Sequence, residues 1–364
     1  MTIDKKFLCE LPRCYAVTHL EIAGASTVLV ATEGEGAAYA FSGPDYADKR
    51  VLWEGPGGTM SSVPIPGRAG EFLAIQKFFK LYQWDEAILV WVKPQADGGF
   101  AVREILHLPY IHRFDLFLKG NRVHFLGCTL AESKETRDDW SKAGKIYVGE
   151  LADDWDEPLN VRVLKDGLYR NHGYSRSVWK GQEAGLVTAD QGAFALTPPD
   201  APGQDWKIEQ FMDWPISDIA ACDIDGDGEL EYATIEPWHG EHFRVYKRAA
   251  AEVGAAAGAG AGGAGRAGRE WRQIYAHPEA AEFYHVGAEA KLAGEPAFVG
   301  GCRRGSQHLF YVRAASKNPL ALEAVTIEEG VGPSNVAIFS EAGKDVIVSA
   351  NREKGEAALN FDRP

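Results

Sequence analysis

The sequence predicts an all-β protein, a seven-bladed β-propeller of four-stranded antiparallel blades. Two observations lead to this fold class. Short apolar runs punctuated by Gly, Pro, Asn and Asp fill the 364 residues, and helical periodicity is scarce. One pattern also recurs seven times: a polar pair behind an apolar or aromatic residue, then a short strand, a tight turn and a second apolar strand.

The spacing of this repeat suits propeller blades. Its first and last openings are 316 residues apart, about 53 residues for each interval, and four-stranded blades repeat every ~40 to 50 residues. The individual intervals are uneven, which indicates loops of different lengths. The seven openings begin at Val17, Met60, Ile111, Tyr174, Ile216, Tyr284 and Pro333.

Each opening supplies the first strand of a blade, and the apolar runs behind it supply the others. Second strands are predicted at 27–32, 71–76, 122–128, 184–189, 231–236, 296–301 and 345–350. Third strands are predicted at 37–41, 87–92, 145–151, 194–197, 243–247, 308–312 and 357–361. Fourth strands are predicted at 51–54, 102–106, 160–164, 206–211, 271–275 and 322–327.

The seventh blade has no fourth strand of its own, because the chain ends soon after Phe361. We expect residues 5–11 to supply that strand, since pairing the two chain ends removes the exposed edge of an open ring. A single domain over 1–364 follows, with one insert. Residues 249–269 are nearly all Ala, Gly and Arg, so they are predicted to form a flexible loop within blade five.

Charge and composition exclude several classes of partner. A net charge of −14 and a pI near 5.2 repel phosphate backbones, so no nucleic acid is expected. No apolar run is long enough to span a membrane, and the first residues do not resemble a signal peptide. Five scattered cysteines indicate reduced thiols and a cytoplasmic protein. A closed ring is compatible with a monomer or a weak homo-oligomer.

One acidic loop is a candidate metal site. Carboxylates at every second residue around two glycines can wrap a hard cation such as Ca²⁺, and the glycines allow the sharp turn. The alternative is an acidic hairpin turn without metal. Because the loop joins a first strand to a second strand, structural Ca²⁺ would lie away from the expected pocket. The predicted ligands are Asp223, Asp225, Asp227, Glu229 and Glu231.

Propeller geometry predicts a second site from residues that are distant in the chain. The entrances of first strands and the loops from second to third strands meet at one mouth of the ring, where binding sites are common. His19, His112 and His285 stand at such entrances, and His172 directly precedes one. A loop of blade five adds His239 and His242.

Clustered imidazoles suit a metal site or an acid–base site, because neutral imidazole binds divalent metals and accepts protons near neutral pH. The alternative for each one is a hydrogen-bonded structural histidine. The predicted catalytic residues are His112, His172, His239, His242 and His285. A divalent metal such as Mn²⁺, Zn²⁺ or Mg²⁺ is expected on His172, His239 and His285. Substrate contacts are expected from His19, Lys77, Arg113, Tyr174, Arg176, Trp238, Arg303 and Asn351.

Three segments carry a family resemblance. The loop 223–231 is similar to the calcium loop of FG-GAP or VCBS-type propeller repeats. Together with 237–241 and the segment from Gly332 to Glu356, it resembles the propeller of aldos-2-ulose dehydratases, the anhydrofructose dehydratase-like enzymes. The resemblance implies a metal-dependent lyase that performs β-elimination on an oxidised (keto) sugar or glycoside. A histidine would remove the proton beside the carbonyl, and a metal or cationic side chain would stabilise the enolate.

Two other classes of function remain open. The propeller can be a non-catalytic carbohydrate- or protein-binding module, because fold does not fix function. It can also be a hydrolase or an epimerase that uses the same histidines.

Overall fold

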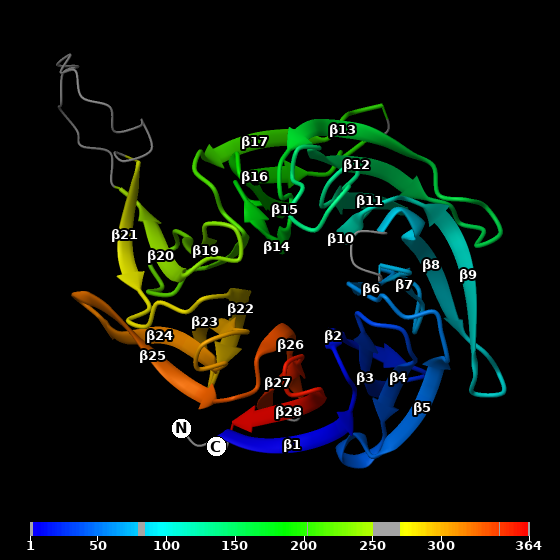
Figure 1. Cartoon of the computed structure of the whole chain (residues 1–364), viewed down its shortest axis with the longest axis horizontal. Helices are drawn as coiled ribbons and strands as arrows, with labels where there is room; N and C mark the ends of the chain where they lie inside the picture. Colours follow the sequence, from blue (N-terminus) through cyan, green and yellow to red (C-terminus); the bar gives the residue numbers. More distant parts are fainter. Residues whose placement is uncertain (1–2, 79–83, 202, 250–269, 342, 363–364) are drawn as a thin grey trace.

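Seven four-stranded antiparallel sheets surround a central axis in the computed structural model (Figure 1). The structure describes residues 3–78, 84–201, 203–249, 270–341 and 343–362. Apart from Ala249, the predicted insert at 249–269 therefore lies outside the described residues. No helix in this described part is long and apolar enough to cross a membrane. The predicted fold class is confirmed.

Each blade runs from an inner first strand to an outer fourth strand (Figure 1). Blades one to three consist of β2 (Cys14–Ile22), β3 (Ala25–Thr32), β4 (Ala38–Ser42), β5 (Asp48–Trp53); β6 (Ser62–Pro64), β7 (Phe72–Gln76), β8 (Ile88–Pro94), β9 (Phe100–His107); and β10 (Ile111–Lys119), β11 (Arg122–Thr129), β12 (Gly144–Leu151), β13 (Val161–Leu168). Short 3-10 turns, η1 (Pro44–Tyr46) and η2 (Trp84–Glu86), lie in the first two.

Blades four to six repeat this arrangement. They consist of β14 (Gly173–Trp179), β15 (Gln182–Ala189), β16 (Gly192–Thr197), β17 (Lys207–Met212); β18 (Asp218–Cys222), β19 (Glu231–Glu236), β20 (His242–Arg248), β21 (Trp271–Ala276); and β22 (Tyr284–Leu292), β23 (Glu295–Cys302), β24 (Leu309–Lys317), β25 (Leu320–Glu328).

The seventh blade joins the two ends of the chain, as predicted. Its sheet order is β26 (Pro333–Glu341), β27 (Lys344–Asn351), β28 (Glu356–Asp362) and β1 (Ile3–Glu10). β1 runs antiparallel to β28, from Ile3 opposite Asp362 to Glu10 opposite Glu356 (Figure 1). The edge that β28 would otherwise expose is therefore covered.

Apolar side chains pack between neighbouring blades and fix their inner strands. Leu29 of blade one packs in one cluster with Phe72 of blade two, and Trp91 of blade two packs with Phe125 of blade three. Space in these layers is tight: a Cβ added at Gly300 would lie 2.3 Å from the Phe310 ring. Such dense packing leaves little freedom for the first strands, so the residues at their entrances are held in fixed positions.

Ring closure generates the first prediction. Deleting residues 1–10 is expected to lower the thermal midpoint strongly and to cause aggregation, because the edge of β28 becomes exposed. Circular dichroism melting and size-exclusion chromatography would measure both effects. Lys5→Ala is the control: it removes ion pairs to Glu328 and Glu356 but keeps the strand, and partly exposed pairs contribute only ~1 kcal/mol or less. A truncated chain that melts like the full chain would contradict ring closure by β1.

Candidate functional site

Four inner strands carry a β-bulge at the same place, their second residue. The pairing register shifts across Tyr15 in β2, His112 in β10, His285 in β22 and Ser334 in β26. A bulge adds a residue that has no cross-strand partner and re-aims its side chain. The bulges therefore explain how strands far apart in the sequence present side chains to one place near the axis.

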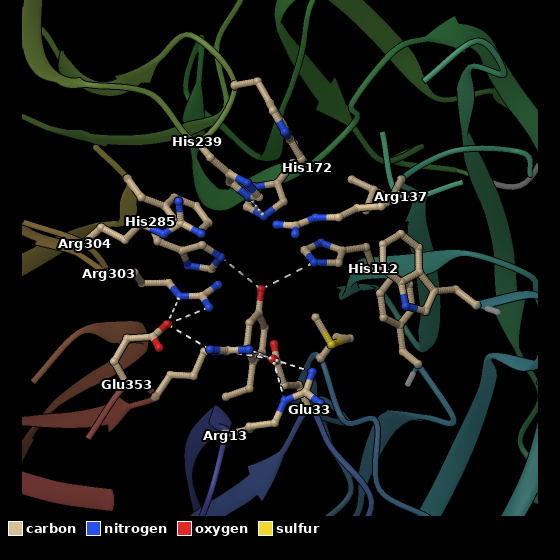
Figure 2. A pocket seen from close by; sticks show the side chains of 18 of the residues that line it. Arg13, Glu33, His112, Arg137, His172, His239, His285, Arg303, Arg304 and Glu353 are labelled. Carbon is tan, nitrogen blue, oxygen red and sulfur yellow. Dashed lines mark hydrogen bonds and ion pairs between the residues drawn. The ribbon is translucent and has the colours of Figure 1, made fainter. Parts of the chain in front are cut away.

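A cavity of about 580 Å³ lies at this place (Figure 2). First-strand entrances and loops between second and third strands form its walls, as the sequence predicted. A volume of this size suits a small molecule such as a sugar. All seven blades contribute, through Tyr15, Phe78, His112, His172, His239, His285 and Arg352 among others.

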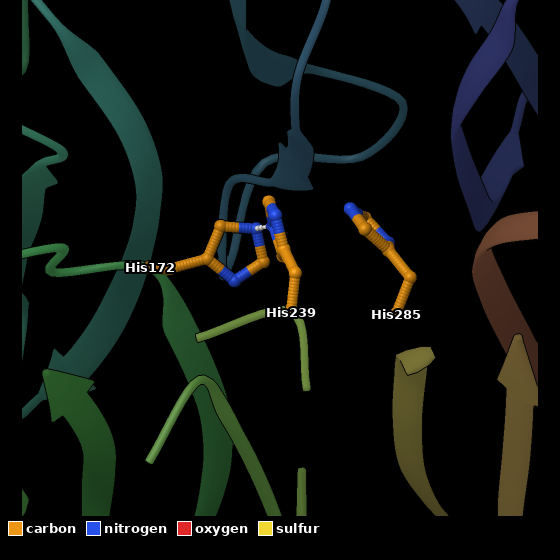
Figure 3. A group of neighbouring side chains, drawn as sticks. All are labelled: His172, His239 and His285. Atoms are coloured by element: carbon orange, nitrogen blue, oxygen red, sulfur yellow. Dashed lines mark hydrogen bonds between the residues drawn. The ribbon is translucent and has the colours of Figure 1, made fainter. Parts of the chain in front are cut away.

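Three imidazoles from three blades converge on the cavity. One ring nitrogen each of His172, His239 and His285 lies within 4.8 Å of the other two (Figure 3). Nε2 of His172 is 3.2 Å from Nε2 of His239. The fourth histidine, His112, lies beside them, with its ring centroid 4.6 Å from that of His172. The sequence-predicted histidine cluster thus contains these four residues.

Backbone carbonyls orient two of these rings. Nδ1 of His172 is 3.1 Å from the carbonyl oxygen of Ser217, and Nδ1 of His285 is 2.6 Å from that of Ser334. A carbonyl oxygen only accepts, so both Nδ1 atoms carry the proton and both Nε2 atoms keep a lone pair. Histidines that bind metals are usually held in this way.

Burial keeps the four histidines neutral. Desolvation lowers the pKa of each one, and nearby arginines lower it further; neighbouring histidines add to the effect for His112, His239 and His285, and the pKa of His172 falls to about 3. The positive charge of Arg113 lowers the pKa of all four histidines, and that of Arg303 lowers the pKa of His172, His239 and His285. At neutral pH the imidazoles are therefore available as metal ligands or bases.

The sequence analysis did not identify Tyr15, and it predicted that His19 would be the residue of blade one that faces the cavity. The first strand of blade one begins at Cys14, not Val17, so Tyr15 takes the position that His112 and His285 take in their blades. Its hydroxyl lies 3.3 Å from Nε2 of His285 and 3.5 Å from Nε2 of His112. His19 lies farther along β2, where its ring stacks on Phe339 at 3.7 Å. Aligning the residues at the second position of each inner strand, with the first strand of blade one begun at Cys14, identifies Tyr15.

The other predicted substrate contacts separate into three groups. Trp238 and Arg303 line the histidine cavity. Arg113, Tyr174 and Arg176 line a second cavity of about 470 Å³, which shares His285 with the first. There Arg176 donates two hydrogen bonds to Asp115, at 2.9 and 2.7 Å, and the Tyr174 hydroxyl donates one at 2.5 Å.

The third group lines neither cavity and contains Lys77, Asn351 and His19, together with the predicted catalytic residue His242. The residue after Lys77, Phe78, faces the histidine cavity instead. His242 begins β20 and pairs with Glu236. The buried amide of Asn351 donates to a Glu356 carboxylate oxygen at 3.0 Å. These residues belong to segments of the chain that lead to the mouth, but their side chains do not line the cavity.

The loop between the second and third strands of blade three forms one wall, at a place that propeller geometry predicted, but none of its residues was among the predicted contacts. Lys134, Arg137 and Trp140, between β11 and β12, line the cavity. Nζ of Lys134 lies 3.2 Å from the Trp140 ring centroid, and the Trp140 ring lies 4.9 Å from that of Trp238. The loop has no periodicity or motif, so its position in the blade indicated the cavity but its sequence did not indicate which of its residues line it.

Comparison with known proteins identifies the fold. No protein-family model and no curated protein matches the chain. The β-propeller domain of Cps50 (Swd1) from Myceliophteria thermophila is 11% identical, with a TM-score of 0.58 over 99% of each chain. The WD40 β-propeller domain of Doa1 is 10% identical, with a TM-score of 0.56 over 99% of this chain and 97% of that one. These likenesses show a propeller. The resemblance to FG-GAP repeats and to aldos-2-ulose dehydratases stays a prediction.

The acidic loop joins β18 to β19, as expected, and an ammonium group occupies it. Nζ of Lys247 lies 2.7 Å from carboxylate oxygens of Asp225, Asp227 and Glu231. Asp223 accepts hydrogen bonds from the loop's own backbone N–H groups, and Glu229 is exposed. Asp223, Asp225 and Asp227 are close enough to share one cation. They fit Ca²⁺ only if the ion displaces Lys247.

This competition generates a prediction about stability. Wild-type protein is expected to melt at nearly the same temperature in EDTA and in calcium, because the ammonium of Lys247 already bridges Asp225, Asp227 and Glu231 and reduces the repulsion among them. Lys247→Met should melt lower in EDTA and recover with Ca²⁺, because carboxylates are left to repel one another until a cation binds. Arg272→Met, an exposed change on the neighbouring strand, is the control. A wild-type midpoint that falls in EDTA would instead indicate a calcium site.

A second prediction concerns pH. Asp218 is buried in the second cavity, and desolvation raises its pKa to about 7 against the opposing charge of Arg113. Between about pH 4 and pH 7 the folded state therefore binds more protons than the unfolded state, so this residue lowers stability as pH rises.

Asp218→Asn should stabilise the protein at about pH 8 by on the order of 4 kcal/mol, and the difference should vanish near pH 4. Urea unfolding across this pH range would measure it. Asp213→Asn, at an exposed position, should show no such trend. A difference of constant size at every pH would contradict the raised pKa.

Proposed function

We propose that the histidine cavity is a metal-dependent site for a small molecule and that its reaction is β-elimination on a keto-sugar. The observation that supports this most is the convergence of His172, His239 and His285 from three blades. Their burial and their neutral state add to it, because a metal needs deprotonated ligands. Single structural histidines would have no reason to meet in this way.

The ligand set favours a transition metal. Three neutral imidazoles with an open side suit Zn²⁺ or Mn²⁺, as in catalytic sites with three protein ligands. Mg²⁺ and Ca²⁺ prefer oxygen ligands, and the three ligands in this cluster are nitrogens. The residues therefore fit a divalent metal held by His172, His239 and His285, which would polarise a carbonyl oxygen of the substrate.

Two neighbouring side chains can move protons. The buried His112 lines the cavity and is neutral, because burial lowers its pKa well below the ordinary value, so this ring can accept the proton on the carbon beside a carbonyl. The Tyr15 hydroxyl lies between His112 and His285. In the proposed elimination the C–H bond breaks toward His112 and a C=C bond forms. The C–O bond to the leaving hydroxyl breaks, and that group departs as water with the proton that Tyr15 delivers.

The walls suit a sugar ring. Trp84, Trp140 and Trp238 line the cavity together with Phe78 and Phe283. Aromatic faces pack against the C–H faces of sugars while hydroxyl groups remain free for polar contacts. The planes of Trp140 and Trp238 cross at 64°, so the two rings form a bent aromatic wall.

A non-catalytic carbohydrate- or protein-binding propeller is the second candidate, since propellers serve many functions. A hydrolase or epimerase would use the same histidines. These candidates differ in product: elimination creates a conjugated enone, which hydrolysis, epimerisation and binding do not. Incubation with 2-keto- and 3-keto-glycosides after metal addition should produce an enone absorbance. Binding without new absorbance across that set would contradict elimination and favour the binding module.

Metal content provides the sharpest test of the site. Protein purified without a histidine tag should contain Zn²⁺ or Mn²⁺ at about one ion per chain. His172→Ala and His285→Ala should each weaken metal binding at least tenfold, because each removes one ligand. Elemental analysis and competition with a chelator would measure this. His107→Ala, an exposed histidine outside the cavity, should keep its metal. Equal metal content in all variants would rule out the cluster as the site.

A further inference from the structure

We propose that the natural ligand of the histidine cavity carries an acidic group, a carboxylate or a phosphate, which is bound by Arg137 and Arg304 at the mouth. This inference deepens the proposed function and rests on it for the placement of the sugar part. It names the substrate class as acidic sugars: sugar acids or sugar phosphates rather than neutral sugars.

The charge of the cavity is opposite to the charge of the protein. The chain has a net charge of −14, yet the cavity is lined by six Lys or Arg side chains and three acidic ones. A cavity of one sign in a protein of the other focuses the field and concentrates ligands of opposite charge. A neutral ligand would gain nothing from this arrangement.

Two of the acidic residues are already paired within one row of alternating charges. Arg13 binds Glu33 at 2.9 Å, and Arg352 binds the same carboxylate at 2.7 Å. Arg352 also reaches Glu353 at 2.8 Å, and Arg303 binds Glu353 at 2.7 Å. Three guanidinium groups thus share two carboxylates (Figure 2). The row leaves an excess of positive charge and holds its arginines in place.

Arg137 and Arg304 stand outside this row. Neither guanidinium has a carboxylate partner within the part of the chain that the structure describes, and both residues are exposed. They lie on opposite sides of the histidine cluster (Figure 2). Arg304 is 5.7 Å from the centroid of Phe283, which also lines the cavity. Guanidinium groups bind carboxylates and phosphates through paired N–H donors.

The backbone near Arg137 is also held by a cation. Nζ of Lys134 donates to the carbonyl oxygen of Arg137 at 2.6 Å and lies over the Trp140 ring. Lys134 is buried, so the loop that carries Arg137 is anchored to the cavity wall. Arg137 is carried by this anchored loop, and Arg304 lies beside the Phe283 ring. Neither guanidinium has an acidic partner among the described residues, so the two can serve as a receptor for an anion next to a sugar-sized space.

Binding of simple acidic sugars would test this inference. The probes are glucuronate, glucose 6-phosphate and glucose, titrated by calorimetry into metal-loaded protein at low and at raised salt. The double variant Arg137→Gln/Arg304→Gln is compared with wild type. Arg272→Gln, which removes one exposed arginine outside the cavity, is the control.

At least one acidic probe should bind wild type at least tenfold more tightly than glucose and lose most of that advantage in the double variant. Raised salt should weaken it, because the contacts are ionic. Tighter binding of glucuronate identifies a carboxylate, and tighter binding of glucose 6-phosphate identifies a phosphate. Equal affinity for all three probes would overturn the inference, as would unchanged affinity in the double variant.

Metal analysis of the same samples separates this inference from the proposed function. The double variant should keep its metal, because neither arginine belongs to the histidine cluster. Protein that holds metal but ignores acidic probes contradicts only the acidic substrate. Protein that binds acidic probes through these arginines but holds no metal contradicts only the metal-dependent site.

Discussion

Closure of the ring by β1 on β28 is the constraint on which the rest of the structure depends. The histidines that meet at the cavity are 172, 239 and 285 in the chain, and nothing local brings them together. Each one is fixed because its blade packs between two others, and the last blade is complete only when β1 joins it. The site is therefore a property of the whole ring, and its geometry requires a closed chain.

Within that ring, β-bulges in the inner strands determine which residues face the axis. A regular inner strand would alternate its side chains between the two neighbouring blades. A bulge at the second residue breaks this alternation and frees one side chain per strand for the centre. Blades one, three and six use this device to present Tyr15, His112 and His285 to the cavity. At the bulge of blade seven, the Ser334 hydroxyl donates to backbone carbonyls and the Ser334 carbonyl accepts a hydrogen bond from Nδ1–H of His285, so this bulge orients the histidine of blade six.

The repeat and its alternation predicted the fold down to the strand that closes the ring, because blade formation depends on a pattern of apolar residues that recurs in the sequence. The same symmetry predicted that His112, His172, His239 and His285 would meet. The prediction failed where it depended on the exact start of a strand. Blade one was predicted to open at Val17, but its first strand begins three residues earlier, at Cys14. Tyr15 therefore lines the cavity where His19 was expected. Propeller geometry predicted that loops such as the one that carries Arg137 line the cavity, but not which of their residues do, because the path of an irregular loop follows from tertiary contacts.

The charges around the histidines serve two purposes that are usually in conflict. Burial, reinforced by nearby arginines, lowers the pKa of the imidazoles and keeps them unprotonated, which a metal site needs, but the positive field of those arginines repels a divalent ion. Glu33 and Glu353 offset part of it through their ion pairs. An anionic ligand would offset the rest. Metal and acidic ligand should then each raise the affinity of the site for the other by the same factor, because coupling between two binding events is reciprocal. In this proposal the arginines at the mouth and the histidine cluster therefore act as one site.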